Sequence, residues 1–92
     1  MTEFEWDPRK AITNRSKHKI LFEDAKSAFN TILEETLNST VDGEDRWQII
    51  GISRTGLILK VIYTIRANGE IIRIISARPL TPKERREDNE HR

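Results

Sequence analysis

Three residues of the sequence are our first candidates for transferring protons or binding phosphate: His18, Arg73 and Arg78. Histidine changes its charge near neutral pH, so it can donate or accept a proton during a reaction. Arginine keeps its charge and can direct two parallel N–H groups at one phosphate. A cleft holding all three would suit acid–base chemistry on a phosphate ester, and these are our candidate catalytic residues.

His18 is the better candidate of the two histidines, because we expect the segment around His91 to fray. We expect His18 at the C-terminal end of a helix over residues 8–18, where the helix dipole favours the charged imidazolium. A charged His18 would serve as a general acid or as a cationic contact to phosphate. The alternative is that His18 only caps the helix end, and the residues alone leave both interpretations open.

Arg73 and Arg78 belong to one expected strand, over 70–78, and regular alternation would place them on opposite faces. The same alternation groups Arg73 with Ile71, Ile75 and Ala77. Both arginines can face one cleft only if the strand ends or bulges before Arg78, which the following proline allows. The alternative for each is an ordinary solvated surface arginine.

Further basic side chains are candidates for following a nucleic-acid backbone. Lys10 and Lys17 are seven residues apart, so they share one face of the expected helix; an ordinary solvated helix face is the alternative. Trp47 could stack on a base, although a place in the core is the favoured alternative. The candidate RNA-binding residues are Lys10, Lys17, Arg46, Trp47, Lys60 and Arg66.

The net charge of +1 conceals an uneven distribution along the 92 residues. Residues 9–19 carry five Lys or Arg and no acid, and residues 20–45 carry seven acids against one lysine. Residues 46–78 carry six Lys or Arg against one acid. Two basic segments therefore flank an acidic one, which predicts a basic face on the folded domain.

Composition and motifs exclude several classes of function. Without cysteine there is no disulfide framework, thiol nucleophile or thiolate metal site, and a reducing compartment such as the cytoplasm fits. No apolar run is long enough to span a bilayer, and residues 1–8 lack the apolar centre of a signal peptide. Neither a phosphate-cradling glycine loop nor a metal-ligand spacing is present, so we expect no cofactor and no metal.

Hydrophobic periodicity predicts the elements that must position these residues. Asp7-Pro8 is typical of a helix start and Asn68-Gly69 of a hairpin turn. We expect a strand over 3–6, helices over 8–18 and 22–30, an undecided strand over 32–38, a polar loop over 39–45, strands over 46–53, 57–66 and 70–78, and a helix over 81–89. This order predicts one α+β domain over 1–92, an antiparallel sheet of about four to five strands with two N-terminal helices packed on it and a short C-terminal helix.

The sequence resembles the BrnT-type toxin family over nearly its whole length. The N-terminal segments that carry the resemblance are Phe4-Glu5-Trp6-Asp7-Pro8, Lys10, Asn14, Lys17, His18, Phe22-Glu23-Asp24-Ala25 and Phe29. The later ones are Gly43-Glu44, Arg46-Trp47, Ile50-Gly51, Val61-Ile62-Tyr63-Thr64, Ile72-Arg73-Ile74-Ile75-Ser76-Ala77-Arg78 and Glu84-Arg85-Arg86. Their joint order and spacing, more than any single piece, carry the resemblance.

This resemblance implies a RelE-like fold and a ribonuclease toxin of a type II toxin–antitoxin system, which cleaves cytoplasmic RNA and so inhibits translation. The implied partner is a BrnA-type antitoxin with a ribbon-helix-helix DNA-binding region, so DNA would be contacted only through the antitoxin. Metal-independent RNA cleavage needs proton transfer and stabilisation of the phosphorane charge, roles that His18, Arg73 and Arg78 could fill.

The alternative is a catalytically impaired module of the same fold that binds its antitoxin or RNA. Asp88 favours it, because many BrnT-type sequences carry a tyrosine near this position. A tyrosine there could stack on a base or assist proton transfer, whereas an aspartate would repel phosphate. A plain RNA-binding domain outside the toxin family has only charge in its support, since no aromatic-rich binding strand is present.

Overall fold

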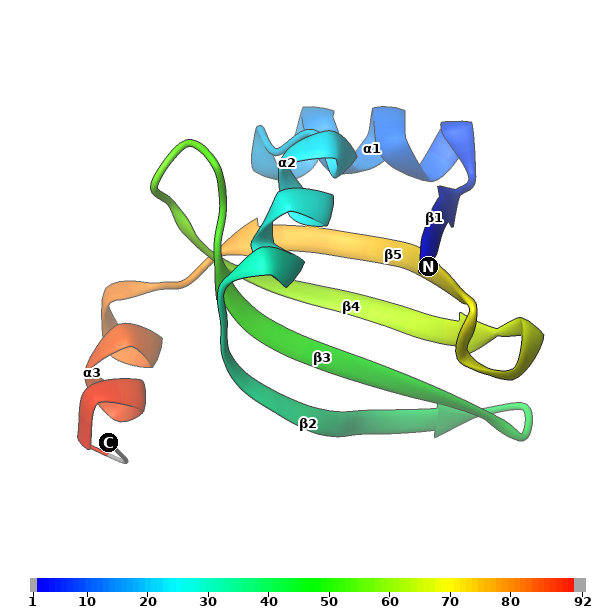
Figure 1. Cartoon of the computed structure of the whole chain (residues 1–92). Helices are drawn as coiled ribbons and strands as arrows, with labels where there is room; N and C mark the ends of the chain where they lie inside the picture. Colours follow the sequence, from blue (N-terminus) through cyan, green and yellow to red (C-terminus); the bar gives the residue numbers. More distant parts are fainter. Residues whose placement is uncertain (1, 91–92) are drawn as a thin grey trace.

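The chain forms strands and helices in the α+β order expected from its sequence (Figure 1). The computed structural model describes the backbone of residues 2–90 and the side chains of residues 2–87. The strands are β1 (Glu3–Trp6), β2 (Ile32–Val41), β3 (Glu44–Ile52), β4 (Ile58–Arg66) and β5 (Ile71–Pro79). The helices are α1 (Pro8–His18), α2 (Phe22–Ser27) and α3 (Pro82–Glu90), with 3-10 turns η1 (Ala28–Asn30) and η2 (Ala67–Gly69).

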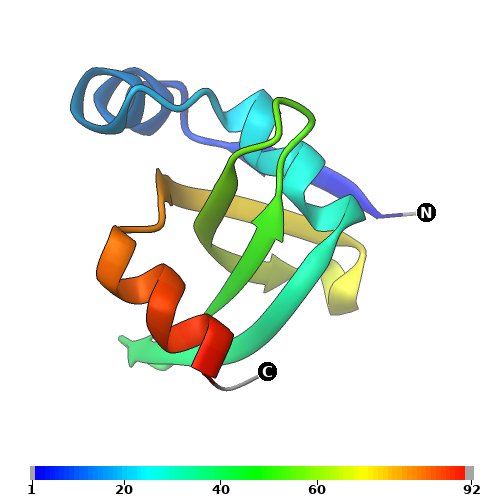
Figure 2. The ribbon, with the colours of Figure 1, turned by 90° about the vertical axis from the view of Figure 1, so that its left-hand side faces the viewer.

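The five strands form one mixed sheet in the order β1-β5-β4-β3-β2. β1 is parallel to β5, whereas every other neighbouring pair is antiparallel, so the expectation of a purely antiparallel sheet was wrong at this edge. Helix α2 and turn η1 cover one face of the sheet, α1 lies along β5, and α3 lies on the opposite side (Figure 2). Among the described residues, no helix is both long and apolar enough to cross a membrane.

Helix α1 begins and ends as its sequence indicates. The carboxylate of Asp7 accepts a hydrogen bond from the Arg9 N–H at 2.8 Å, and Pro8 occupies the first turn. After His18 the chain turns at Lys19, whose φ of 62° is left-handed and whose N–H bonds back to the Arg15 carbonyl. The expected helix over 22–30 is divided into α2 and the tighter turn η1.

The hairpin between β2 and β3 corrects one expectation and decides another. The undecided segment over 32–38 is a strand, and β2 continues to Val41, so the expected loop over 39–45 was wrong. The connection consists of Asp42 and Gly43 alone, both with positive φ, which is the conformation that a two-residue hairpin turn requires. Polar residues before the turn are compatible with a strand because β2 is an edge strand with exposed side chains.

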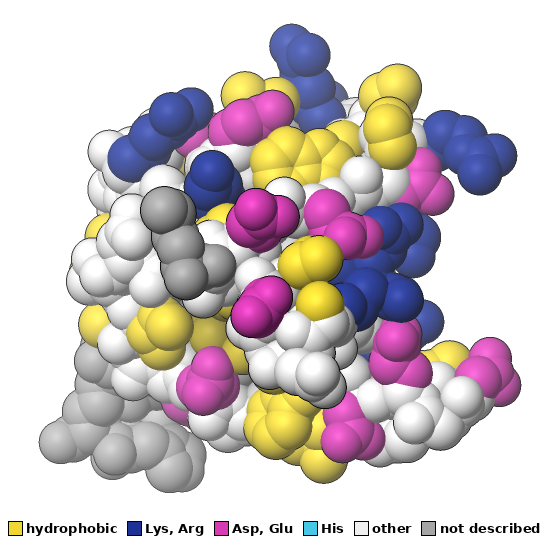
Figure 3. Space-filling model, turned by 45° about the vertical axis from the view of Figure 1, so that its right-hand side comes forward, with side chains coloured by type: hydrophobic (Ala, Val, Ile, Leu, Met, Phe, Trp, Pro, Cys, Tyr) yellow, Lys and Arg dark blue, Asp and Glu magenta, His cyan; other side chains and the backbone are white. Residues whose placement is uncertain are grey.

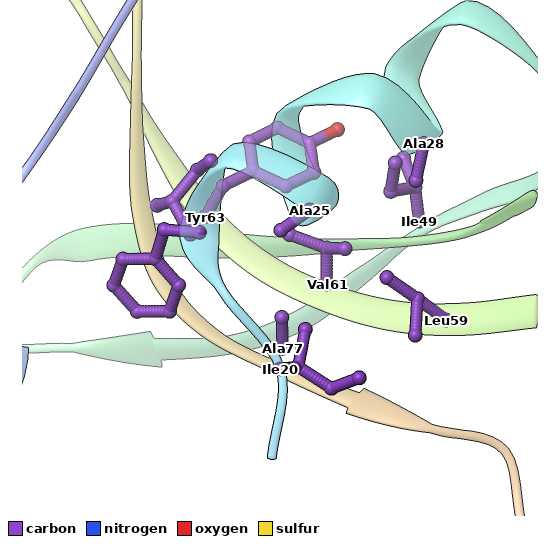
Figure 4. Close-up of a cluster of buried hydrophobic side chains, with 10 residues drawn as sticks. Ile20, Ala25, Ala28, Ile49, Leu59, Val61, Tyr63 and Ala77 are labelled. Atoms are coloured by element: carbon purple, nitrogen blue, oxygen red, sulfur yellow. The ribbon is translucent and has the colours of Figure 1, made fainter. Parts of the chain in front are cut away.

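The core lies between the sheet and the first two helices. Leu59, Val61 and Tyr63 project from β4 toward α2, where Ala25 is fully buried (Figure 4). The Tyr63 hydroxyl reaches the rim and donates to the Glu35 carboxylate at 2.7 Å. Gly51 allows η1 to lie directly on β3, since a Cβ there would come within 2.3 Å of the Ala28 carbonyl oxygen.

Asn14 is the buried residue that joins α1 to the sheet. β1 pairs with β5 only as far as Ile74, and beyond that point the Asn14 side chain takes the place of a neighbouring strand. Its amide donates to the Ala77 carbonyl at 2.9 Å, and its oxygen accepts from the Ala77 N–H at 3.0 Å. The apolar Ile12 of this helix is 70% exposed. The helix is therefore held to the sheet largely through a polar side chain.

We expect Asn14→Ala to destabilise the protein strongly. The substitution leaves the Ala77 N–H and two carbonyls without their partner, at a cost of about 1–3 kcal/mol for each buried group left unsatisfied. Urea unfolding should show a loss of roughly 2–4 kcal/mol, whereas the exposed Ser16→Ala on the same helix should change stability by less than about 0.5 kcal/mol. Equal stability of the two variants would show that Asn14 is not the anchor.

Candidate functional site

A β-bulge in β5 decides which side chains share the candidate site. Ile62 of β4 pairs with Ser76, but the next residue, Tyr63, pairs with Ile74, so Ile75 is the extra residue of the bulge. The alternation of faces is reset at this point. Arg73 and Arg78 consequently project from the same face of the sheet. A regular strand would have placed them on opposite faces. The alternative that this strand bulges before Arg78 is confirmed. Arg73 and Ala77, which a regular strand would place on one face, therefore lie on opposite faces.

We call the sheet face opposite α2 the basic face, defined by Arg46, Lys60, Arg66, Arg73 and Arg78. The register places Lys60 opposite Arg78 and Thr64 opposite Arg73 on neighbouring strands. Trp47 pairs with Tyr63 on the core side, so Arg46, which precedes Trp47 in β3, and Thr64, which follows Tyr63 in β4, project to the other face. The basic face therefore spans β3, β4 and β5. On the side shown in Figure 3, basic side chains gather at the upper and right-hand margins, whereas acidic and hydrophobic ones alternate in the centre.

Glu84 of α3 neutralises two cations of this face. Its carboxylate accepts two hydrogen bonds from Arg78, at 2.6 and 2.8 Å, and one from Lys60 Nζ at 3.4 Å. The same carboxylate accepts from the Thr81 N–H, while the Thr81 hydroxyl accepts from the Glu84 N–H, which is a capping box at the start of α3. The hydrogen bonds from Arg78 and Thr81 hold the pKa of Glu84 far below its ordinary value, and Glu84 in turn raises the pKa of Arg78.

Two further carboxylates compensate two more arginines. Arg73 pairs with Glu5 of β1, and Arg66 pairs with Glu44 of β3 at 3.3 Å. Among the described residues, no carboxylate lies within ion-pairing distance of Arg46. Four of the five cations on the basic face are thus neutralised within the chain, and Arg46 is the exception.

A groove beside the basic face, which we call the His18 groove, contains the candidate histidine. It has a volume of about 340 Å³ and runs between α1 and the part of β5 that β1 leaves uncovered. Its lining residues are Arg9, Lys10, Thr13, Asn14, Lys17, His18, Ile75 and Ser76. Ser76 also belongs to the basic face, so the groove and the face meet along β5.

The electrostatics of the groove oppose one expectation for His18. Partial burial, together with the positive charges of Lys17 and Arg78, lowers the pKa of His18 below its ordinary value of 6.5. The expectation that the helix dipole would favour the imidazolium was therefore wrong in direction. A neutral imidazole at pH 7 is suited to accepting a proton.

The structure brings some candidates together and separates another. Lys10 and Lys17 line the His18 groove, and Arg46, Lys60 and Arg66 lie on the basic face with Arg73 and Arg78. Trp47 instead packs against the core on the opposite side of the sheet, as the core alternative for this residue stated.

Sequence reasoning missed three residues of the site: Thr64, Glu5 and Glu84. The Thr81-to-Glu84 spacing is typical of a capping box and could have indicated the position of Glu84 at the start of α3. Nothing local in the sequence predicts the pairing of Glu5 with Arg73, because the two residues are 68 positions apart. The Asp88 side chain and His91 lie outside the described residues. Within the described part of the chain, no three histidine or carboxylate side chains cluster as metal ligands would.

A small α+β domain with several cations on one sheet face and an adjoining histidine groove has features that are common in proteins that bind polyanions. The family of the chain is more specific. The family model described as the ribonuclease toxin BrnT of type II toxin–antitoxin systems matches residues 6–84. The chain therefore belongs to the BrnT family of ribonuclease toxins, and the type II class to which this family belongs pairs each toxin with an antitoxin.

A solved structure agrees with this assignment. The crystal structure of the Brucella abortus ribonuclease toxin BrnT is similar to this chain, with a TM-score of 0.67 and 28% sequence identity. The similarity covers 88% of this chain and 99% of the Brucella chain. No curated protein sequence matches the chain significantly.

We expect Glu84→Gln to loosen α3 at neutral pH. A carboxylate whose pKa is depressed in the folded protein contributes stability above its unfolded pKa, near 4.5, and loses that contribution as the pH falls. At pH 7 the α3 amides of the variant should exchange with solvent about tenfold faster than those of the wild type. The difference should shrink below pH 4.5, and the exposed Lys83→Gln should show none. A difference that persists unchanged into acid would contradict the role of the Glu84 charge.

Proposed function

We propose that this protein is a metal-independent endoribonuclease whose active site lies where the His18 groove meets the basic face. The observation that carries this proposal is the bulge at Ile75, which turns Arg73 and Arg78 to one face beside the groove. Without the bulge, the two arginines would lie on opposite sides of the sheet and could not share a substrate. The family and the Brucella structure support ribonuclease activity, and the choice of residues is our own inference.

The reaction would be transfer of the phosphoryl group to the neighbouring 2′-hydroxyl. Neutral His18 accepts the 2′-hydroxyl proton as the 2′ oxygen attacks phosphorus, and the bond to the 5′ oxygen breaks. The products are a 2′,3′-cyclic phosphate and a 5′-hydroxyl, whose oxygen takes its proton from water. Arg73 and Arg78 stabilise the extra negative charge on the phosphorane.

The RNA backbone would follow the cations on both sides of this point. Lys10 and Lys17 line the groove, and Lys60, Arg66 and Arg46 continue across the sheet. Exposed ion pairs contribute little to stability, so a phosphate can replace the Glu44 carboxylate at low cost, whereas the Glu5 carboxylate forms a part-buried pair with Arg73. The two-pronged contact of Glu84 with Arg78 is the strongest of these pairs and must be exchanged or displaced for Arg78 to reach RNA.

The antitoxin partner is proposed to be a BrnA-type protein with a ribbon-helix-helix region, which alone would contact DNA. One feature supports a docking position at the β2 end of the sheet: β2 is an edge strand, and no other described strand pairs with its outer backbone. A segment added there would lie over the basic face and block RNA. A complex structure with the antitoxin wholly on the α1–α2 side would refute this placement.

A catalytically impaired module that binds antitoxin or RNA remains the second candidate. The specific observation in its favour is that both candidate catalytic arginines are paired with carboxylates of the same chain, Arg73 with Glu5 and Arg78 with Glu84. In such a module these ion pairs would be permanent and no phosphate would reach the arginines. Both candidates share the cytoplasmic location proposed for a toxin that acts on RNA.

RNA cleavage by the purified protein in EDTA distinguishes the two candidates. We expect the wild type to cleave, and His18→Ala, Arg73→Ala and Arg78→Ala each to lose on the order of 10²-fold or more in rate, because each removes a group that acts in the transition state. The matched control is Arg54→Ala, whose arginine pairs with Asp24 away from the basic face. Absence of cleavage by a well-folded wild type would favour the binding module, and cleavage lost in EDTA would refute metal independence.

The pH dependence of cleavage tests the role of His18. A base must be neutral to act, so the rate should rise with pH through the lowered pKa of His18 and then level off. The midpoint should lie below 6.5, and Lys17→Gln should move it upward because one nearby positive charge is removed. NMR titration of the His18 ring gives the same pKa without RNA. A rate that falls as the pH rises through this midpoint would indicate that His18 acts in its charged form.

A further inference from the structure

Arg78 and Lys60 converge on a single anion, the carboxylate of Glu84. Arg78 donates one hydrogen bond to each carboxylate oxygen, at 2.6 and 2.8 Å, and Lys60 Nζ donates to one of them at 3.4 Å. The two-pronged contact of an arginine suits a phosphate as well as a carboxylate. The side chains of Arg78 and Lys60 are 33% and 23% exposed, so solvent reaches this cluster. The two cations therefore form an accessible anion site that the chain fills with its own carboxylate.

Helix α3, which carries Glu84, has no apolar anchor of its own. Pro82 is the only apolar residue among those from Pro82 to Glu90. The chain is fixed to the core just before the helix, at Leu80, which is buried and whose N–H donates to the Ile58 carbonyl at 3.1 Å. Figure 1 shows α3 as an arm joined to β5 at this point. A helix without an apolar face depends on its polar contacts and opens at a lower free energy than the core.

The closed position of α3 is unfavourable to RNA. A hollow of about 250 Å³ lies between this helix and strands β2, β3 and β4. Glu34, Glu84 and Glu87 line it, together with Lys60. Like charges repel, so a phosphate is disfavoured here while α3 is in place. Movement of α3 would take two of the three carboxylates away and release Lys60 and Arg78 from Glu84.

We propose that Arg78 and Lys60 form a phosphate-binding site for the RNA backbone, and that α3 is an autoinhibitory lid whose Glu84 carboxylate occupies this site until RNA displaces it. The inference rests on the proposed action on RNA and adds to it the regulation of the same site. The chain after Leu80 is the hinge of the lid, and the core is the same in the closed and open arrangements. Only the open fraction of the protein binds RNA at this site.

Glu84→Gln gives the proposal a quantitative test. If only open molecules bind, the apparent affinity is proportional to the open fraction while this fraction is small. The roughly tenfold faster exchange of the α3 amides expected for this variant corresponds to a tenfold larger open fraction. Its affinity for a 2′-O-methyl oligoribonucleotide, which cannot be cleaved, should therefore also rise about tenfold at pH 7. An unchanged or lower affinity would overturn the proposal.

Glu44→Gln is the matched control. It removes the same charge from the same face, but the partner of Glu44 is Arg66 of β4 and not a residue of α3. General electrostatic attraction would raise the affinity of both variants equally, whereas a lid raises that of Glu84→Gln more. We expect the affinity of the control to change by about twofold or less, because its ion pair is exposed. Equal gains in the two variants would overturn the lid.

Adding Arg78→Gln to Glu84→Gln tests the phosphate site itself. The open lid then uncovers Lys60 alone, so most of the gain in affinity should be lost. A gain that survives in the double variant would place the phosphate elsewhere and overturn the site.

Hydrogen exchange of the wild type with RNA bound provides a measurement that depends on no variant. A saturating 2′-O-methyl oligoribonucleotide should accelerate exchange of the α3 amides about tenfold or more, because the bound state holds the lid open. The β4 amides that pair with β5 should not become faster, since the sheet stays intact. If the α3 amides are unchanged or slower at saturation, RNA binds with the helix closed and the proposal is wrong.

The outcomes separate the lid from the proposed catalysis. If the wild type cleaves RNA while α3 stays closed in the complex and Glu84→Gln binds no more tightly, the lid is refuted and the catalytic proposal stands. If α3 opens on binding and Glu84→Gln binds more tightly, but the wild type does not cleave, the lid stands and catalysis fails.

Discussion

The extra residue in β5 is the constraint on which the rest of the structure depends. Before Ile75 the strand is covered on its outer edge by β1, and after it the edge is covered by the Asn14 amide. The bulge lies at this change of neighbour. It lets Ile74 and Ala77 both point into the core, with two residues between them where a regular strand would have one. The same offset sends Arg73 and Arg78 to the other face, so the packing of the core and the composition of the basic face have one cause.

The basic face is close to neutral within the chain, although its cations are dense. Carboxylates from β1, β3 and α3 lie among them, which limits the repulsion that unpaired like charges would cause on one sheet. Only the pair between Glu84 and Arg78 has the two-pronged geometry of a strong contact, and Glu84 also caps its own helix. Attachment of α3 to the sheet and access to Arg78 therefore depend on the same carboxylate.

The two faces of the sheet differ in the kind of side chain that they carry. The side toward α2 contains the buried aromatic and aliphatic residues, including Tyr63 and the partly buried Trp47. The opposite side carries the five cations of the basic face, four of which are paired with carboxylates of the same chain. Stability comes mainly from the buried apolar contacts of the first face, and the second face presents charged side chains. Such a division is typical of proteins whose binding surfaces are less stable than their cores.

The sequence by itself determined the order of elements, the start of α1 at Asp7-Pro8, the hairpin turn at Asn68-Gly69 and, through its motifs, the family. These features depend on residues close together in the chain, where local conformational preference and periodicity operate. Even the hairpin at Asp42-Gly43 had a local signal, although the polar residues around it obscured the strand.

Only the tertiary structure decided the parallel pairing of β1 with β5, the bulge at Ile75, the contact of Asn14 with Ala77 and the burial of Thr64. Each of these depends on residues that are adjacent in the sheet but remote in the sequence, such as the 63 positions between Asn14 and Ala77. A one-residue shift in strand pairing moves a side chain to the opposite face, and the alternation of residues within one strand cannot reveal such a shift. The candidate catalytic residues could therefore be named from the sequence, but their arrangement could not.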